Sequence, residues 1–151
     1  MGYSFFHNFK KGWEADLGAR FTKTENQEFT AGVIGIGKYI GSYWINLRSY
    51  IQKDSDNVYT AFTLTGRYYF NTRFDYGTII AGYGTSPDER TTLGQFGQRV
   101  ALDSYRIGGG YYRMFSNRYL TGIQAMYNKQ EYAPGLKQNE IELSILLQYK
   151  F

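Results

Sequence analysis

The sequence predicts an all-β protein, an antiparallel transmembrane β-barrel of the up-and-down type, and three observations lead to this fold class. Apolar and polar residues alternate with a period of two, which is the pattern of a strand with two different faces. The alternating segments are roughly ten residues long, the length that a tilted strand needs to cross a bilayer. The connections are alternately short and more polar, like the periplasmic turns and external loops of such barrels.

The alternation gives eight full strands and a shorter aromatic segment before them. Residues 3–9, with the sequence YSFFHNF, form the short segment, which we expect to be a partial N-terminal strand. Single-chain bacterial barrels have even strand numbers, so a genuine ninth strand implies partner strands from a missing segment or from another chain. The eight full strands are expected at residues 13–24, 28–39, 43–52, 58–70, 76–85, 100–114, 119–130 and 139–151.

The first two full strands differ in how clearly they alternate. In residues 13–24, Trp13, Leu17 and Phe21 alternate with charged and small residues, which indicates a strand with one apolar face. The alternation of residues 28–39 is weaker. The split expected there puts Phe29, Ala31 and Val33 on one face and Thr30, Gly32 and Lys38 on the other.

The next five strands have clear apolar faces. In each, large apolar residues recur at alternate positions, opposite residues such as Asn, Gln, Thr, Ser and Arg. A single long loop, residues 86–99, interrupts the series. The residues expected to point outward are Tyr43, Ile45, Leu47 and Ile51; Phe62, Leu64, Tyr68 and Phe70; Ile79, Ala81 and Tyr83; Tyr105, Ile107 and Tyr111; and Tyr119, Ile123, Ala125 and Tyr127.

The last strand, NEIELSILLQYKF at residues 139–151, shows the pattern most clearly. One face carries Ile, Leu, Tyr and Phe, and the strand ends on the aromatic Phe151, as the last strand of a bacterial outer-membrane barrel does. The other face must accept Glu140, Glu142 and Lys150. A barrel with lipid outside and a polar interior accommodates these charges.

The composition agrees with long paired strands in a membrane. The chain has 151 residues, about one domain, with 16 Tyr, 11 Phe, 18 Gly and 2 Pro. The mean hydropathy of -0.48 is compatible with a barrel, because only every second residue faces lipid. There is no Cys, and the charge of +4 is scattered, which argues against a nucleic-acid partner. No export signal is visible, so we expect a processed chain or the C-terminal part of a longer barrel.

Aromatic residues gather near the turns that are expected on the periplasmic side. Aromatic girdles at both membrane interfaces would produce this distribution, whereas a general preference of aromatics for strands would not track alternate turns. The residues near the periplasmic turns are Trp13, Tyr39, Tyr43, Trp44, Tyr69, Phe70, Phe74, Tyr76, Tyr112, Phe115, Tyr119, Tyr149 and Phe151.

Several segments together resemble the YaiO-like family of outer-membrane β-barrel proteins. The resemblance covers most of residues 12–151 and implies a barrel of Gram-negative bacteria without a well-established activity. It also implies a loose link to surface polysaccharide systems, and it supplies no catalytic residues. The segments are GWEADLGARF (12–21), GKYIGSYWINLRSYI (37–51), LTGRYYF (64–70), GYGTSPDER (82–90) and LLQYKF (146–151).

The charged residues at inward positions are the candidate site. In a narrow lumen they must pair or stay hydrated, so an ion-pair network that fills the barrel is the first interpretation. A lumen that conducts or binds an anionic substrate is the second interpretation; eight strands leave little room for an aqueous channel, and twelve or more would favour it. The predicted inward residues are Glu14, Asp16, Arg20, Lys38, Arg48, Arg67, Arg106, Glu140, Glu142 and Lys150.

Neither an enzyme nor a metal site is expected. The only His is His7, in the short N-terminal segment, and no residues around it have the pattern of a nucleophile with its base. No catalytic residue, metal ligand or cofactor is therefore assigned. The long external loop is the candidate for partner or glycan contact, through Asp88, Glu89 and Arg90.

These inferences predict a barrel of the bacterial outer membrane with a structural, interaction or transport role at the cell surface. The expected partners are outer-membrane lipids and lipopolysaccharide, the barrel-insertion machinery through the C-terminal strand, and another envelope protein. The alternatives are a subunit of a larger envelope complex, a lipid-modifying barrel enzyme, and a soluble barrel whose apolar face lies inside.

Overall fold

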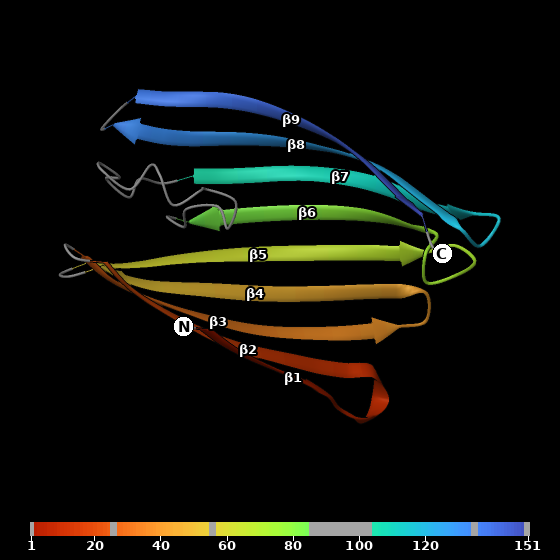
Figure 1. Cartoon of the computed structure of the whole chain (residues 1–151), viewed down its shortest axis with the longest axis horizontal. Helices are drawn as coiled ribbons and strands as arrows, with labels where there is room; N and C mark the ends of the chain where they lie inside the picture. The colour runs from red at the N-terminus through yellow and green to blue at the C-terminus, as the bar shows by residue number, and fades with distance from the viewer. Residues whose placement is uncertain (1, 25–26, 55–56, 85–103, 134–135, 150–151) are drawn as a thin grey trace.

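The chain folds into one antiparallel sheet of nine strands in the order of the sequence (Figure 1). The structure is a computed structural model that describes residues 2–24, 27–54, 57–84, 104–133 and 136–149. A short 3-10 turn, η1 (Lys10–Gly12), links the first two strands. The strands are β1 (Gly2–Asn8), β2 (Trp13–Thr24), β3 (Gln27–Ile40), β4 (Tyr43–Asp54), β5 (Asn57–Tyr69), β6 (Tyr76–Gly84), β7 (Ser104–Phe115), β8 (Tyr119–Ala133) and β9 (Leu136–Tyr149).

The all-β meander and its strand bounds confirm the predicted fold class. All eight full strands are present near their predicted ends, and residues 3–9 do form a strand, β1, of seven residues. The predicted reversal at 40–42 is a two-residue turn in which Gly41 has a φ of +59°, a conformation that glycine adopts without strain. The long loop at 86–99 lies outside the described residues. Among the described residues, no helix is long and apolar enough to span a membrane.

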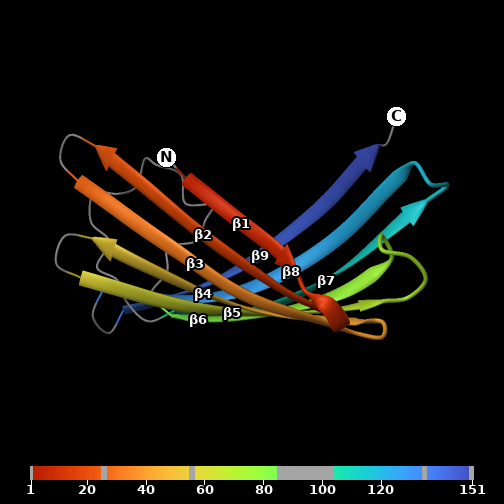
Figure 2. The ribbon, with the colours of Figure 1, turned by 90° about the horizontal axis from the view of Figure 1, so that it is seen from below.

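The sheet is strongly curved and remains open along two edges. Figure 2 shows it as a trough, with β1 and β9 rising at its two sides. In the part of the chain that the structure describes, β1 pairs with β2 and β9 pairs with β8, and no ladder joins β1 to β9. Because nine strands alternate in direction, β1 and β9 run the same way.

The two faces of the sheet have opposite character. Paired residues on neighbouring strands share a face, so the register assigns every strand position to one side. Large apolar side chains stay exposed on one side; Ile79 is 68% exposed, Ile141 79% and Ile145 79%. Buried polar groups lie on the other side, where Asn46 is 3% and Thr63 8% exposed. Side chains converge on the concave side of a curved sheet, so the polar side is the inner face and the apolar side the outer face.

This pattern inverts that of a soluble domain. Among the described residues, the buried hydrophobic ones are only Ala61 and Met126. A soluble barrel that keeps its apolar face inside therefore does not describe this chain. The exposed apolar face is the surface that lipid covers in a membrane barrel.

The predicted division of residues 28–39 into two faces agrees with the register, but the inward assignment of Lys38 is wrong. Ile34 and Ile36 are 54% and 51% exposed, on the outer face with Leu17 of β2. Lys38 belongs to the same outer set, where its Nζ lies 4.4 Å from the centroid of the Trp13 ring. Within residues 28–39, the inner register positions of β3 are Phe29, Ala31, Val33, Gly35, Gly37 and Tyr39. None of these residues is charged, so the alternation gives no polar signal for the inner face.

The facing of β9 yields a first prediction. Leu143 is 64% exposed on the outer face, and Leu146 lies on the inner face of the same strand. Leu143→Arg should lower the folded fraction in bilayers, because an arginine facing lipid at the midplane costs about 2–4 kcal/mol. The measurement is the heat-modifiable fraction on a gel after insertion into vesicles.

The matched control is Leu146→Arg, the same substitution on the opposite face. We expect its folded fraction to stay near that of the unchanged chain. Equal losses in the two variants would contradict the assignment of the faces.

Candidate functional site

The candidate site is the polar and aromatic inner face of the sheet. The register places seven of the predicted inward charges on this face. Arg20 lies at an inner register position of β2, but its side chain is outside the described set, as is all of Lys150. That this face lines a lumen stays a prediction. The seven residues are Glu14, Asp16, Arg48, Arg67, Arg106, Glu140 and Glu142.

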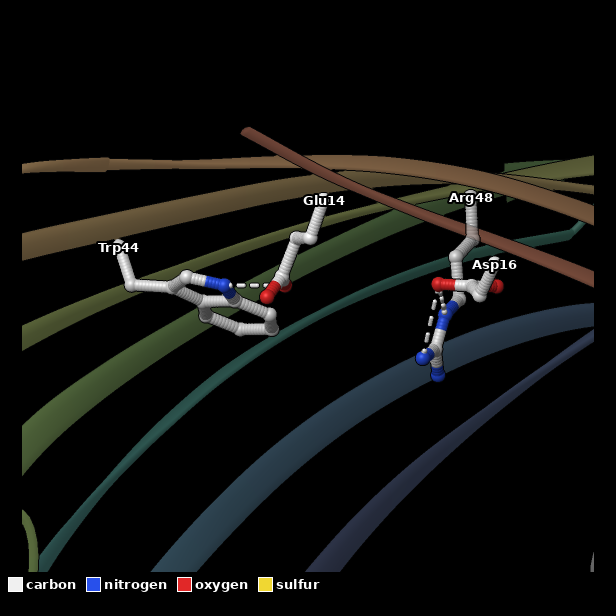
Figure 3. A network of polar contacts seen from close by, with 4 residues as sticks. All are labelled: Glu14, Asp16, Trp44 and Arg48. Atoms are coloured by element: carbon white, nitrogen blue, oxygen red, sulfur yellow. Dashed lines mark hydrogen bonds and ion pairs between the residues drawn. The ribbon is translucent and has the colours of Figure 1, made fainter. Parts of the chain in front are cut away.

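Glu14 reaches across a whole strand to contact Trp44. Glu14 lies on β2 and Trp44 on β4, and the indole Nε1 donates a hydrogen bond of 2.5 Å to Glu14 Oε1 (Figure 3). Between them lies Gly37 of β3, which pairs with Glu14. A Cβ at position 37 would stand 2.6 Å from Glu14 Oε1, so the carboxylate occupies the space that any other residue would fill. Glu14 itself is 5% exposed.

A second contact of the same kind joins Asp16 to Arg48. Both Nε and Nη2 of Arg48 donate to Asp16 Oδ2 at 3.2 Å (Figure 3). Gly35 of β3 pairs with both residues and leaves room for the Asp16 carboxylate above it. The Arg48 side chain is 43% exposed, so solvent weakens the pair, and its main effect is to fix the two side chains in place.

The other half of the sheet repeats the arrangement with opposite polarity. Arg106 of β7 donates from Nη2 to Thr63 Oγ1 of β5 at 3.1 Å. Gly82 of β6 lies between them in the register, and a Cβ there would stand 2.8 Å from Arg106 Nε. Gly35, Gly37 and Gly82 therefore leave room for long polar side chains to reach across one strand and contact the strand on its other side.

Five aromatic side chains form a continuous strip on the inner face near the short turns. Tyr39 and Tyr69 have ring centroids 6.5 Å apart, Tyr69 and Tyr76 5.5 Å, and Tyr76 and Tyr112 4.9 Å. Trp44 joins the strip, with its centroid 6.3 Å from that of Tyr39. We call these five residues the aromatic strip.

The aromatic strip refines the predicted girdle. Its members were expected at the lipid interface because they lie beside the periplasmic turns. The register places them on the inner face instead, whereas Tyr43 and Tyr68, with centroids 4.9 Å apart, lie on the outer face. The alternation within each strand could have predicted this division of the aromatic residues between two faces, because neighbours such as Tyr43 and Trp44 must point to opposite sides of the sheet.

Arg67 lies within the aromatic strip. Its guanidinium carbon is 4.7 Å from the centroid of Trp44 and 5.0 Å from that of Tyr76, distances typical of cation–π contacts. Arg67 Nε and Asn46 Nδ2 are buried and have no hydrogen-bond partner in the structure. Asn46 is two residues from Trp44 on the same face of β4, so the two unsatisfied donors belong to one region.

The other residues considered in the sequence analysis, His7 and those of the long loop, do not join this polar inner face in the part of the chain that the structure describes. His7 lies on the outer face of β1, with its ring centroid 6.1 Å from that of Phe5 and 4.5 Å from that of Phe9. The described residues contain no group of three or more His, Cys, Asp or Glu side chains that suits a metal ion. The loop candidates Asp88, Glu89 and Arg90 lie outside the described residues.

The glycine contacts yield a second prediction. Gly37→Ala should displace the Glu14 carboxylate from Trp44 and lower the free energy of unfolding by about 1–3 kcal/mol, the cost of unpairing a buried polar group. The measurement is the midpoint of urea unfolding in detergent, followed by tryptophan fluorescence. Gly66→Ala is the matched control, because a Cβ at Gly66 meets nothing within 4 Å. A loss of equal size in both variants would contradict the role of Gly37.

Comparison with known proteins identifies the family. The model of the YaiO membrane beta barrel domain matches residues 1–89, which is more than half of the 151 residues. The match spans β1 to β6 and includes the glycines and carboxylates of the β2–β4 contacts. No curated protein and no solved structure matches the chain. The family match, the all-strand fold and the apolar outer face agree, and the chain belongs to the YaiO membrane beta barrel family.

Proposed function

We propose that this chain is an outer-membrane barrel protein of Gram-negative bacteria with a structural, interaction or transport role at the cell surface, linked to surface polysaccharide. The observation that carries the proposal is the inversion of the two faces. An exposed apolar outer face suits lipid, and a polar and aromatic inner face suits water or a polar ligand. Outer-membrane lipids and lipopolysaccharide are then the partners of the outer face.

The role that we propose is binding or structure, without catalysis. Support comes from the placement of the ionisable groups. Glu14 and Asp16 bind Trp44 and Arg48, so these carboxylates are engaged in holding strands together. His7, the base that a lipid-modifying barrel enzyme would require here, lies among aromatic rings on the outer face.

A second candidate function, as a subunit of a larger envelope complex, is favoured by the two open edges. In hydrocarbon, unpaired backbone groups on a sheet edge are too costly to persist. Direct pairing of β1 with β9 would be parallel, because both strands run in the same direction. An antiparallel closure needs an odd number of further strands between them, which another envelope protein or another segment supplies. In either case β9 is the strand that we propose the insertion machinery contacts.

Membrane fractionation tests the proposed location. We expect the chain to sediment with the outer-membrane fraction and to leave it only when detergent is added, because the outer face would otherwise be exposed to water. On a gel, the detergent extract should contain a form that changes mobility on boiling. A shift of the single chain would support closure by the chain itself, and a heat-labile form of higher mass would support the complex. Recovery in the soluble fraction without detergent would contradict both candidates.

A further inference from the structure

We propose that the aromatic strip, together with Asn46 and Arg67, binds a neutral oligosaccharide. This inference rests on the proposed function and names the class of ligand for the inner face. Two observations carry it independently: aromatic rings follow one another across β3 to β7, and two buried donors in the same region lack an acceptor.

The aromatic faces suit the apolar side of sugar rings. A pyranose has faces of C–H groups that pack on Tyr and Trp, whose rings are apolar and whose hydroxyl and N–H groups remain available for hydrogen bonds. Successive ring centroids in the strip, from Tyr39 through Tyr69 and Tyr76 to Tyr112, lie 4.9–6.5 Å apart. Tyr39 is 46% exposed, so its ring is available for contact. Tyr39 stacks on Tyr69 and Tyr76 on Tyr112, so a ligand would contact the faces and edges that these pairs leave uncovered. Such contacts along the row suit a chain of sugars better than a single one.

The unsatisfied donors suit sugar hydroxyl groups. Asn46 is 3% exposed and its Nδ2 has no acceptor, and Arg67 Nε is also without one. A buried donor without a partner destabilises the protein, so a ligand that supplies an acceptor to it gains binding free energy. A hydroxyl oxygen that enters beside Trp44 would supply this acceptor.

The charges around the strip favour a neutral ligand. The Glu14 carboxylate accepts a hydrogen bond from Trp44, and the Arg67 guanidinium lies over the same indole ring. One negative and one positive group therefore both contact Trp44, which leaves no excess of either charge at this ring. The charges of Asp16 and Arg48 offset each other in the same way, in an ion pair farther along the same two strands. An acidic sugar would meet the Glu14 carboxylate without a net positive charge to offset it.

The two tryptophans of the sequence allow a direct test. Trp44 lies in the strip, and Trp13 lies on the outer face beside Lys38. Trp13→Phe leaves Trp44 as the only tryptophan, and Trp44→Phe leaves Trp13 as a reporter on the lipid side. Each chain is purified from outer membranes in an amine-oxide detergent, because a maltoside headgroup is itself a sugar. Its fluorescence is then titrated with maltohexaose.

We expect maltohexaose to change the Trp44 emission saturably and to leave the Trp13 emission unchanged. Sorbitol, which has hydroxyl groups and no ring face, should have no saturable effect. Hexagalacturonate, an acidic chain of the same length, should bind more weakly than maltohexaose. A flat Trp44 titration, an equal response at Trp13, or tighter binding of hexagalacturonate would overturn the proposal.

A pair of matched substitutions in the Trp13→Phe chain tests the role of Arg67. Arg67→Lys removes the Nε donor and keeps the charge, and it should weaken maltohexaose binding on the order of tenfold, the effect of one hydrogen bond to a charged group. Arg113→Lys is the control, because Arg113 lies over Phe115 on the outer face, and its affinity should not change. Equal affinities in the two variants would remove Arg67 from the site.

Heat-modifiability of each sample distinguishes a failure of the saccharide site from a failure of the proposed barrel. A chain that shows the folded, heat-modifiable form and does not respond to maltohexaose overturns the saccharide site and leaves the barrel in place. A chain that shows no such form in any detergent extract contradicts the proposed function, and the saccharide site with it.

Discussion

The hydrogen bonding of the backbone in lipid is the constraint on which the rest of this structure depends. A strand in hydrocarbon finds no water for its N–H and C=O groups, so it needs a partner strand along each side. The meander meets this condition for β2 through β8 by pairing every strand with its neighbours in the sequence. The edges of β1 and β9 remain, and their shared direction restricts how the sheet is completed. Among the described residues, the two strands that pair on one side only are therefore β1 and β9, at the open edges of the sheet.

Once the sheet exists, its curvature determines what the two faces do. The outer face spreads apart and keeps residues such as Ile141 and Ile145 exposed for lipid. The inner face converges, so polar side chains there shield one another. Convergence alone would cause collisions between long side chains on adjacent strands. The inner glycines relieve this crowding, because Gly35, Gly37 and Gly82 let a charged side chain pass over one strand to the next. The polar network and the curvature therefore depend on the same glycines.

The arrangement also explains how an inner face with many charges remains compatible with a neutral ligand. Carboxylates and guanidinium groups are placed so that they compensate each other locally, with Glu14 and Arg67 at Trp44 and Asp16 at Arg48. Beside these groups lie the row of aromatic rings and two donors without acceptors, Asn46 Nδ2 and Arg67 Nε. The aromatic strip packs the end of the sheet near the short turns. The same strip is the surface that we propose for ligand contact.

The strands, their order and most of their facing can be predicted from the amino-acid sequence, because a period of two is a local property that each segment carries alone. The predicted direction is wrong at β3, where Lys38 was expected inward but lies on the outer face, because the inner positions of this strand carry glycines and uncharged residues. Which polar side chains contact each other could not be predicted from the sequence. The Glu14–Trp44 and Asp16–Arg48 contacts join residues on strands separated by another strand, and their formation depends on register, curvature and the space above a glycine. These are properties of the assembled sheet, which no single segment of the sequence contains.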